Sequence, residues 1–335
     1  MTGEDEVVGE GTYIYESVIH AEVIALKQAG ERARGGTAYV SLEPHSHFGK
    51  TAPCTEALIN AGISRVVCPI EDPNPLVSGR GFERLRAAGI EIVTGLLADE
   101  ASKLNEKFIC WHKKQRPFVH LKLAMSLDGR ISLGNSVSTA LSGEAALKRV
   151  HELRHEYDAI LIGGNTAGVD NPSLTDRSGK ARRRPLVRVV LDNRLRIALD
   201  SVLVRSANAA PTIVFTNSDD DAKIAGLQDR EVEVVSLETG GRDLAKVLEY
   251  LKERSIQSLL VEGGSEIAGA FCDAGLVDKI TLIIAPLIIG GPDAPTAIGG
   301  KGASSIADAV KLRDISIERL GEDIEITGYS FESRL

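Results

Sequence analysis

The sequence predicts an α/β protein with two domains, and three observations lead to this prediction. The chain has 335 residues, enough for two domains that each bury a core of their own. Apolar, strand-like runs alternate with helix-like runs, which is typical of α/β layer architectures. The polar and basic stretch 111–117 (WHKKQRP) interrupts this alternation, and we place the domain boundary there. The two domains are therefore expected at residues 1–112 and 117–335.

The first half of the chain predicts three helices and three strands. Helices are expected at residues 20–30, 54–61 and 81–88, and strands at 38–42, 65–70 and 90–93. Gly62 and Gly89 follow two of these helices and are good C-caps. Residues 2–5 have a turn composition and lead into a strand-like segment at 6–8. One hypothesis is that a preceding strand and helix are missing, through truncation or a misplaced start codon.

The second half repeats the alternation of strands and helices. Strands are expected at residues 119–124, 159–162, 186–191, 212–215, 258–261, 279–285 and 315–320. Helices are expected at 144–156, 244–254 and 266–274.

Composition limits the partners and the location of the protein. A net charge of -8 argues against broad nucleic-acid binding, which requires basic patches. The most apolar stretch, 280–289, is too short to span a membrane, and the acidic first residues lack an apolar signal region. Four cysteines without a CxxC pair indicate thiols in a reducing compartment. We therefore predict a cytoplasmic protein that binds neither nucleic acid nor membrane.

Residues typical of a zinc site follow one another at the spacing found in zinc deaminases. His20 and Glu22 form an H-x-E element, and His45 and Cys54 come later in the chain. In such enzymes a His and two Cys hold the metal, and the Glu transfers protons without binding it. Because imidazole also binds zinc well, His45 in place of the first Cys leaves a His/His/Cys ligand set open. The alternative is that His20 starts a helix, His45 lies in a loop and Cys54 belongs to the core.

Longer motifs resemble one enzyme family from about residue 6 onward. Segments 20–22 (HAE) and 42–54 (LEPHSHFGKTAPC) are similar to the patterns HAE and LEPCSHxGxTPPC of the bifunctional riboflavin-biosynthesis deaminase/reductase. Further similar segments are 71–75 (EDPNP), 121–130 (LKLAMSLDGR), 163–166 (GGNT), 170–172 (DNP) and 261–264 (VEGG).

The resemblance implies a fold and an activity for each half. The first half would be a cytidine-deaminase-like domain with zinc, and the second a dihydrofolate-reductase-like domain with NADPH. The implied reaction is reduction of the ribosyl group of 5-amino-6-(5-phosphoribosylamino)uracil to ribityl, together with zinc-dependent deamination of the preceding diaminopyrimidine. The substrate would be a phosphoribosylaminopyrimidine, and the family expectation is a homodimer or higher homo-oligomer through the reductase domain.

The sequence departs from the family pattern only in its first half. His45 stands for a Cys, Ala52 stands for a Pro, and the opening helix and strand are not found. Three alternatives stay open: a bifunctional enzyme, a reductase whose inactive deaminase domain serves as scaffold, and a regulatory protein that binds a nucleotide without turnover.

The resemblance also implies roles for individual residues. His20, His45 and Cys54 would bind the metal, and Glu22, Lys122 and Glu262 would be catalytic. Substrate contacts carry over to Ser138, Arg154, Leu174, Arg177 and Glu262. Cofactor contacts carry over to Ala124, Ala140, Thr166, Asp170, Asn193, Gly264, Ser265, Glu266, Ile267, Ala268, Gly269 and Ala270.

Three further interpretations rest on the residues themselves. Lys122 lies in an otherwise apolar strand, where a buried lysine is costly unless paired, so we favour a site role. Asp128 is either a turn-forming residue or a site residue. The basic run 182–184 is expected to be solvated, with contact to the extra phosphate of the cofactor as the alternative. Replacement of Glu262 by Ala is expected to abolish reduction and to leave folding intact.

Overall fold

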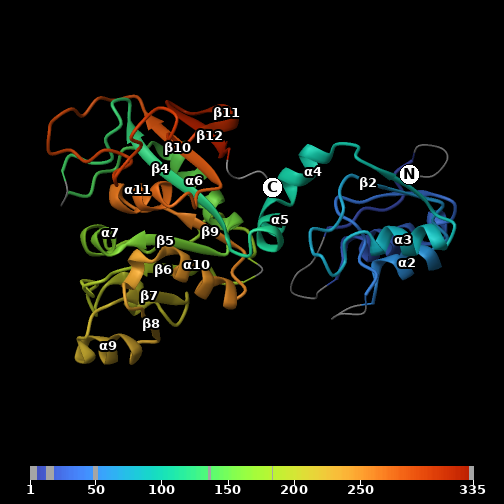
Figure 1. The fold of residues 1–335 in the computed structure, drawn as a ribbon, viewed down its shortest axis with the longest axis horizontal. Coiled ribbons are helices and arrows are strands. Elements are labelled where there is room, and N and C mark those ends of the chain that lie inside the picture. The colour runs from blue at the N-terminus through green and yellow to red at the C-terminus, as the bar shows by residue number, and fades with distance from the viewer. Residues whose placement is uncertain (1–5, 13–18, 48–51, 135–136, 183, 332–335) are drawn as a thin grey trace. The chain divides into compact units, whose positions relative to one another are not determined.

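The computed structural model describes residues 6–12, 19–47, 52–134, 137–182 and 184–331, and the chain divides into two compact units (Figure 1). The division falls between Gln115 and Arg116. Within the described residues, no helix combines the length and the apolarity needed to cross a membrane. All four cysteines belong to the described part of the chain and are free thiols.

Unit 1 contains a small parallel sheet with the strand order β1-β2-β3. Its elements are α1 (Ala21–Ala29), η1 (Gly30–Ala33), β1 (Thr37–Tyr39), α2 (Cys54–Asn60), β2 (Arg65–Cys68), α3 (Arg80–Ala87), β3 (Glu91–Thr94), α4 (Ala98–Leu104) and α5 (Glu106–Lys113). The three predicted helices and three predicted strands are confirmed. Gly62 and Gly89 have φ of 71° and 82°, so both follow their helices in the left-handed conformation expected of a C-cap.

Two local predictions in unit 1 are wrong. Residues 6–8 form no strand, and the side chain of Val8 belongs to the apolar core that also contains Ala29 and Leu58. The strand expected to reach residue 42 ends at Tyr39, where the chain turns toward the loop that carries His45. The stretch 111–117 begins inside α5, because that helix continues to Lys113, and its last four residues lie outside the helix.

Unit 2 is built on a nine-stranded sheet with the order β11-β12-β10-β4-β9-β5-β6-β7-β8, which Figure 1 shows from β11 at the top to β8 at the bottom. Its strands are β4 (Phe118–Ser126), β5 (Ala159–Gly163), β6 (Val187–Leu191), β7 (Thr212–Thr216), β8 (Val232–Ser236), β9 (Ser258–Val261), β10 (Lys279–Ala285), β11 (Leu312–Leu320) and β12 (Asp323–Ser330). Its helices are α6 (Glu144–Glu156), α7 (Gly164–Asp170), α8 (Val202–Arg205), α9 (Asp221–Gln228), η2 (Gly240–Arg242), α10 (Leu244–Glu253) and α11 (Ser265–Asp273). The neighbours from β10 through β4 to β8 are parallel, and β12 is antiparallel to both β10 and β11.

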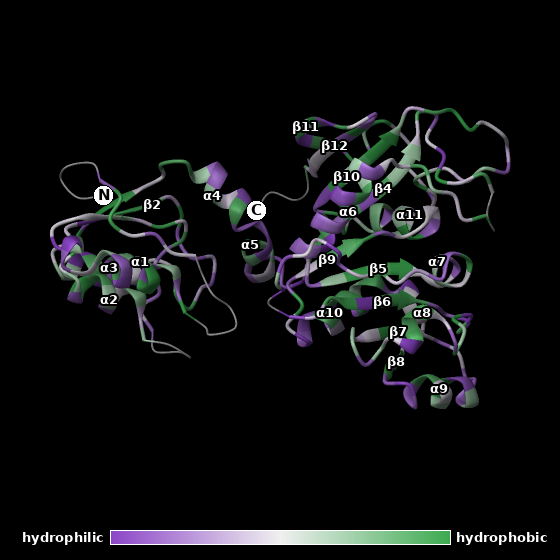
Figure 2. Ribbon diagram, turned by 180° about the vertical axis from the view of Figure 1, so that it is seen from behind, coloured by the Kyte–Doolittle hydropathy of each residue, from purple (hydrophilic) through white to green (hydrophobic). Residues whose placement is uncertain are grey.

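Helices cover both faces of this sheet, and each face has its own apolar core. Helices α10 and α11 pack on one face through residues such as Leu248 and Phe271. Helices α7, α8 and α9 pack on the other face beyond β5, and α6 covers that face near β10 through Val150. Figure 2 shows the hydrophobic colour concentrated along the strands between these layers. Burial on both faces explains why the central strands read as continuous apolar runs.

The carboxyl ends of the central parallel strands form one edge where polar and glycine residues gather. Strand β9 leads into Glu262, β5 into Gly164 and β6 into Asp192. In open α/β sheets, ligands bind beyond this edge, so the fold itself marks the place to look for a site in unit 2.

Candidate active sites

In unit 1, three metal-binding side chains from separate segments converge. His20 precedes α1, His45 lies in the loop after β1, and Cys54 is the first residue of α2. Their ligand atoms all lie within 4.8 Å of one another, and the two imidazole rings have centroids 4.4 Å apart. The amide of Thr55 donates to the carbonyl of His45 at 3.3 Å, which ties the loop to the start of α2.

The environment of this cluster favours a neutral imidazole at His45. Burial, followed by the nearby imidazoles of His20 and His47, lowers the pKa of His45 to about 4, against a smaller opposing effect of the Ala52 backbone. A neutral imidazole keeps a lone pair available for a metal. Burial also raises the pKa of the Cys54 thiol, and so does the carboxylate of Glu22, to which the thiol is hydrogen-bonded. Glu22 therefore lies directly beside the cluster, as the zinc-deaminase pattern requires.

The donor set of the cluster fits zinc. Two imidazoles and one thiol are all groups that bind zinc, and catalytic zinc sites use three protein ligands. The ring of His47, two residues further along the same loop, stands edge-on to that of His45 with centroids 5.4 Å apart.

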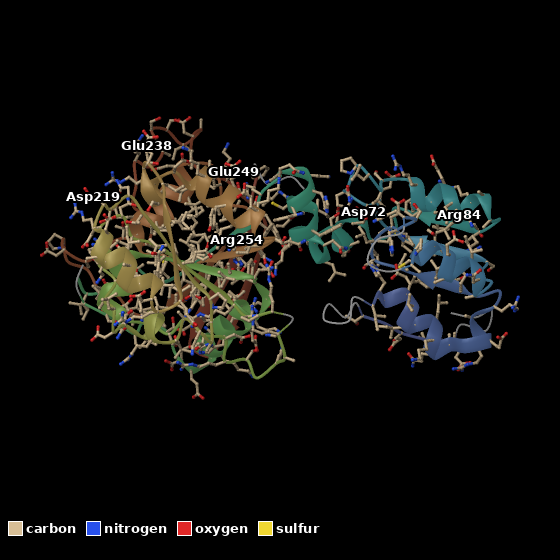
Figure 3. All side chains as sticks on the ribbon, turned by 90° about the horizontal axis from the view of Figure 1, so that it is seen from below. Asp72, Arg84, Asp219, Glu238, Glu249 and Arg254 are labelled. Carbon is tan, nitrogen blue, oxygen red and sulfur yellow. The ribbon has the colours of Figure 1, made fainter. Side chains whose placement is uncertain are left out.

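A buried carboxylate that sequence reasoning missed organises the loops beside the cluster. Glu43 is 3% exposed and accepts hydrogen bonds from the backbone amides of Asp72 (3.0 Å), Gly79 (2.9 Å), Gly81 (2.8 Å) and Phe82 (3.3 Å). Figure 3 labels Asp72 in this part of unit 1. Glu43 thus joins the loop that carries His45 to the start of α3. The sequence showed Glu43 only as part of the segment LEPHSH, two residues before His45.

In unit 2, a lysine, a glutamate and an arginine meet at the sheet face under α6. The pairing of Leu121 with Val261 in β4 and β9 places the next residues, Lys122 and Glu262, side by side. Arg154 on α6 donates two hydrogen bonds to the carboxylate of Glu262, from Nε to Oε1 at 2.8 Å and from Nη2 to Oε2 at 2.9 Å. The two side chains are only 15% and 10% exposed, so this is a buried, bidentate ion pair.

The charges of this trio act on one another in opposite directions. Burial lowers the pKa of Lys122, while the charge of Glu262 raises it and that of Arg154 lowers it. Burial raises the pKa of Glu262, but Arg154 and Lys122 outweigh this, so the pKa lies below its usual range. Glu262 is therefore an anion at neutral pH, next to a lysine that loses its proton more readily than a solvated one.

Gly264 follows this trio in the chain and lies at the start of α11. A Cβ on Gly264 would lie 3.6 Å from Oγ1 of Thr166, and the first turn of α11 has no side-chain cap. Backbone amides at such a helix start suit a phosphate. One strand further along, Oδ1 of Asn193 accepts from the amide of Gly241 at 2.8 Å. Thr166, Asn193 and Gly264 thus follow neighbouring strands at one edge, as a dinucleotide requires.

The other residues for which the resemblance implies a role differ in how far they are exposed. Ser138, Ala140 and Asp170 are exposed, Ala124 is half-buried under α6, and Leu174 is 3% exposed within the core. Within α11, Ser265, Glu266, Ile267 and Ala270 remain at least partly accessible, whereas Ala268 belongs to the core and Gly269 packs against the backbone of Gly299.

The basic run 182–184 is not solvated as expected. Arg182 is 19% exposed and donates from Nη1 to the carbonyl of Arg154 at 2.8 Å and from Nη2 to that of Tyr157 at 2.6 Å. Arg184 donates to the carbonyl of Ser255. Residue 183 lies outside the described residues. Carbonyls at the end of α6 lack helical partners, and Arg182 satisfies them.

Models of known protein families match both units of the chain. Residues 117–326 match the model of the RibD C-terminal domain, and residues 2–70 match that of the cytidine and deoxycytidylate deaminase zinc-binding region. The riboflavin biosynthesis protein RibD of Actinobacillus pleuropneumoniae is 42% identical over 321 residues, which are 95% of this chain and 85% of that protein.

Solved structures agree with these matches. Acinetobacter baumannii RibD is 33% identical with a TM-score of 0.87, over 98% of this chain and 90% of that one. The diaminohydroxyphosphoribosylaminopyrimidine deaminase/5-amino-6-(5-phosphoribosylamino)uracil reductase of Thermotoga maritima is also 33% identical, with a TM-score of 0.84 over the same shares.

The fold and site thus define a two-domain deaminase/reductase. The chain belongs to the RibD family of riboflavin biosynthesis enzymes, whose reductase uses NADPH and whose deaminase region is of a zinc-binding kind. The predicted fold class, pathway and cofactors are confirmed.

Proposed function

We propose that unit 2 reduces the ribosyl group of 5-amino-6-(5-phosphoribosylamino)uracil to ribityl with NADPH. The Thermotoga maritima relative is named for this reaction. The observation that carries the proposal is the meeting of Lys122, Glu262 and Arg154 next to Gly264, where α11 starts. A protein that only bound a nucleotide would not require a buried lysine at this place.

NADPH, when bound, supplies a hydride for the sugar carbon. The ring oxygen must take up a proton as its bond to that carbon breaks, and we assign this proton to the amino group of Lys122. Burial already lowers the pKa of Lys122, which makes it a better proton donor near neutral pH. Glu262 keeps Lys122 charged until the proton moves, and Arg154 holds Glu262 in one orientation through two hydrogen bonds.

We also propose which residues bind NADPH and which bind the substrate. Thr166, Asp170, Asn193 and the start of α11 from Gly264 would contact the cofactor, together with Ala124 and Ala140. Arg177 would bind the phosphate of the substrate, with Ser138 and the backbone of Leu174 alongside. The best-aligned donors of Arg154 are hydrogen-bonded to Glu262. We therefore propose that Arg154 orients Glu262 and does not contact the phosphate.

Unit 1 is proposed to deaminate the preceding diaminopyrimidine with zinc held by His20, His45 and Cys54. Zinc, when bound, activates water at neutral pH. Glu22, beside Cys54, would move the proton of that water to the leaving amine. The convergence of the three ligand atoms within 4.8 Å supports this proposal despite the histidine at position 45.

The reductase proposal is tested with Lys122→Met. Turnover of NADPH with the pyrimidine substrate is expected to fall by roughly 100- to 10,000-fold, the usual contribution of a positioned acid. Lys148→Met, on the same unit but on α6, is the control and should keep its activity. Turnover of Lys122→Met within a factor of three of the unchanged protein would remove Lys122 from the mechanism.

The deaminase proposal is tested by ammonia release with zinc present and NADPH absent. Release that disappears in Glu22→Gln supports deamination by a His/His/Cys site. Cobalt in place of zinc adds a second test, because its thiolate absorption should vanish in Cys54→Ser and change in His45→Ala. No release, together with normal reduction of the deaminated substrate, would make this chain a reductase with an inactive deaminase domain.

The domain limits, the homo-oligomer and the cytoplasmic location stay predictions. The pathway substrate follows from the family, and the assembly state requires a measurement of mass in solution.

A further inference from the structure

The loop that carries Arg177 is held in an uncommon backbone conformation. It follows α7, and both Asn171 (φ 40°) and Leu174 (φ 49°) adopt the left-handed region. This region is unfavourable for leucine by about 1–2 kcal/mol, because its Cβ approaches the following carbonyl. Leu174 is nevertheless buried in the core, so contacts on both sides of it must hold the loop in place.

Asp176 provides three of these contacts. Its Oδ2 accepts hydrogen bonds from Nδ1 of His155 at 2.8 Å and from Nη1 of Arg182 at 3.0 Å, and its Oδ1 accepts from the amide of Ser178 at 2.8 Å. The carboxylate is 5% exposed. Burial raises the pKa of Asp176, but the bonds to Ser178, Arg182 and His155 outweigh burial and hold the pKa well below its usual range.

These contacts fasten the loop to the end of α6. His155 belongs to that helix, and Arg182 also donates to the helix carbonyls of Arg154 and His155. Arg154 adds a weaker bond of 3.3 Å from Nη1 to the carbonyl of Thr175. The same helix therefore orients Glu262, through Arg154, and the loop, through His155.

The arrangement leaves the charge of Arg177 uncompensated. Its guanidinium contacts only hydroxyls within the described residues: Oγ1 of Thr175 at 3.4 Å and Oγ of Ser173 at 3.1 Å. Its neighbour Asp176 is the nearest carboxylate in sequence, but His155 and Arg182 already occupy it. An exposed arginine without a carboxylate partner is suited to bind a phosphate in paired fashion.

We propose that Asp176 is a positioning residue that holds the loop 173–178 on α6 so that Arg177 meets the phosphate of the substrate. The proposal rests on the reductase function and adds to it a residue that touches neither substrate nor cofactor. Asp176 also keeps its own charge away from Arg177, so that the two do not neutralise each other.

The test compares the substrate with the same molecule lacking its phosphate. Asp176→Asn keeps the shape of the side chain and removes its charge, and Asp176→Ala removes both. Loss of hydrogen bonds between charged groups is expected to raise KM for the phosphorylated substrate roughly 10- to 100-fold. The value of kcat should stay within about threefold, because Lys122 and Glu262 are untouched, and KM for NADPH should not change.

With the substrate that lacks phosphate, the variants and the unchanged protein should have equal kcat/KM. Asp220→Asn is the matched control, because Asp220 also binds a backbone amide, that of Lys223 at 2.9 Å, at a helix start elsewhere in unit 2. His155→Asn should raise KM in the same sense, and combination with Asp176→Asn should add little.

Two results would overturn the proposal. One is unchanged KM in Asp176→Asn, and the other is an equal loss with and without the phosphate, which would indicate a general effect on the fold. If Asp176→Ala does not fold, Asp176→Asn and His155→Asn still decide the question. Failure of the unchanged protein to reduce the substrate would instead refute the reductase function itself.

Discussion

Replacement of Glu262 is expected to affect stability as well as activity. The sequence suggested that Glu262→Ala would leave folding intact. In the structure, Glu262 is the bidentate partner of Arg154, and both side chains are largely buried. Removal of one partner leaves the Arg154 guanidinium charged and without its two best hydrogen bonds. Breaking a buried pair in this way costs about 3–5 kcal/mol.

The cost translates into a measurable shift of the melting temperature. For a unit of this size, each kcal/mol lowers Tm by about 2–4 °C, so Glu262→Ala should melt roughly 6–20 °C below the unchanged protein. Replacement of both partners, in Glu262→Met with Arg154→Met, should recover most of that loss, because well-packed apolar residues often replace a buried pair without penalty. Reductase turnover should not recover, because Lys122 then lacks its neighbouring anion.

The assay is thermal unfolding of unit 2 within the full chain, paired with NADPH-dependent turnover. Glu262→Gln separates the two effects further, since its amide oxygen keeps one of the two hydrogen bonds from Arg154 while the charge and the second acceptor are lost. Its turnover should fall while its Tm falls less than that of Glu262→Ala. A Tm of Glu262→Ala equal to that of the unchanged protein, or full activity of the double variant, would refute the reasoning.

Other side chains give further expectations. Arg188 is fully buried, donates to the carbonyls of Ser173, Leu203 and Ala210, and has its pKa lowered by burial to about 10, so Arg188→Met should cost about 3 kcal/mol or more in unfolding experiments. Glu43→Ala removes the acceptor of four backbone amides, so it should lower the Tm of unit 1 and release bound cobalt. Replacement of the exposed Glu31 by Ala should do neither. Hydrogen bonds from Ser126, Ile289 and Gly290 lower the pKa of Asp128 from 3.8 to about 2. The stabilisation by its charge is therefore present above pH 4 and is lost as the pH falls toward 2. Amide exchange at Gly290 should accelerate over this range in the unchanged protein, whereas Asp128→Asn should show no selective acceleration there.

The long, strongly patterned elements could be predicted from the sequence. The helix at 144–156 and the strands at 258–261 and 279–285 have the predicted bounds, because their apolar spacing or apolar runs end at clear turn residues. Short elements were missed, among them α7 and α8, of seven and four residues. Segments this short bury too few apolar residues to show a period, and they form because tertiary contacts hold them.

The sites were predictable where a motif names a residue and unpredictable where partners come from distant segments. His20, His45 and Cys54 come together as their spacing indicated. Nothing local to Glu43 showed that it would bind amides near residues 72 and 82, since those partners are brought to it by the fold. Asp176 likewise acquires its role from His155 and Arg182.

Histidine in place of cysteine at position 45 removes one thiolate charge from the ligand set that would hold a zinc ion. With one thiolate instead of two, a bound zinc ion keeps one more unit of positive charge, and the burial that keeps His45 neutral does not offset it. A more positive zinc ion, when bound, would lower the pKa of a water molecule further and would leave a weaker nucleophile. Deamination by this chain should therefore persist at lower pH than in a site with two cysteines. A pH–rate profile that matches the two-cysteine variant His45→Cys would show that the third ligand does not set the acidity.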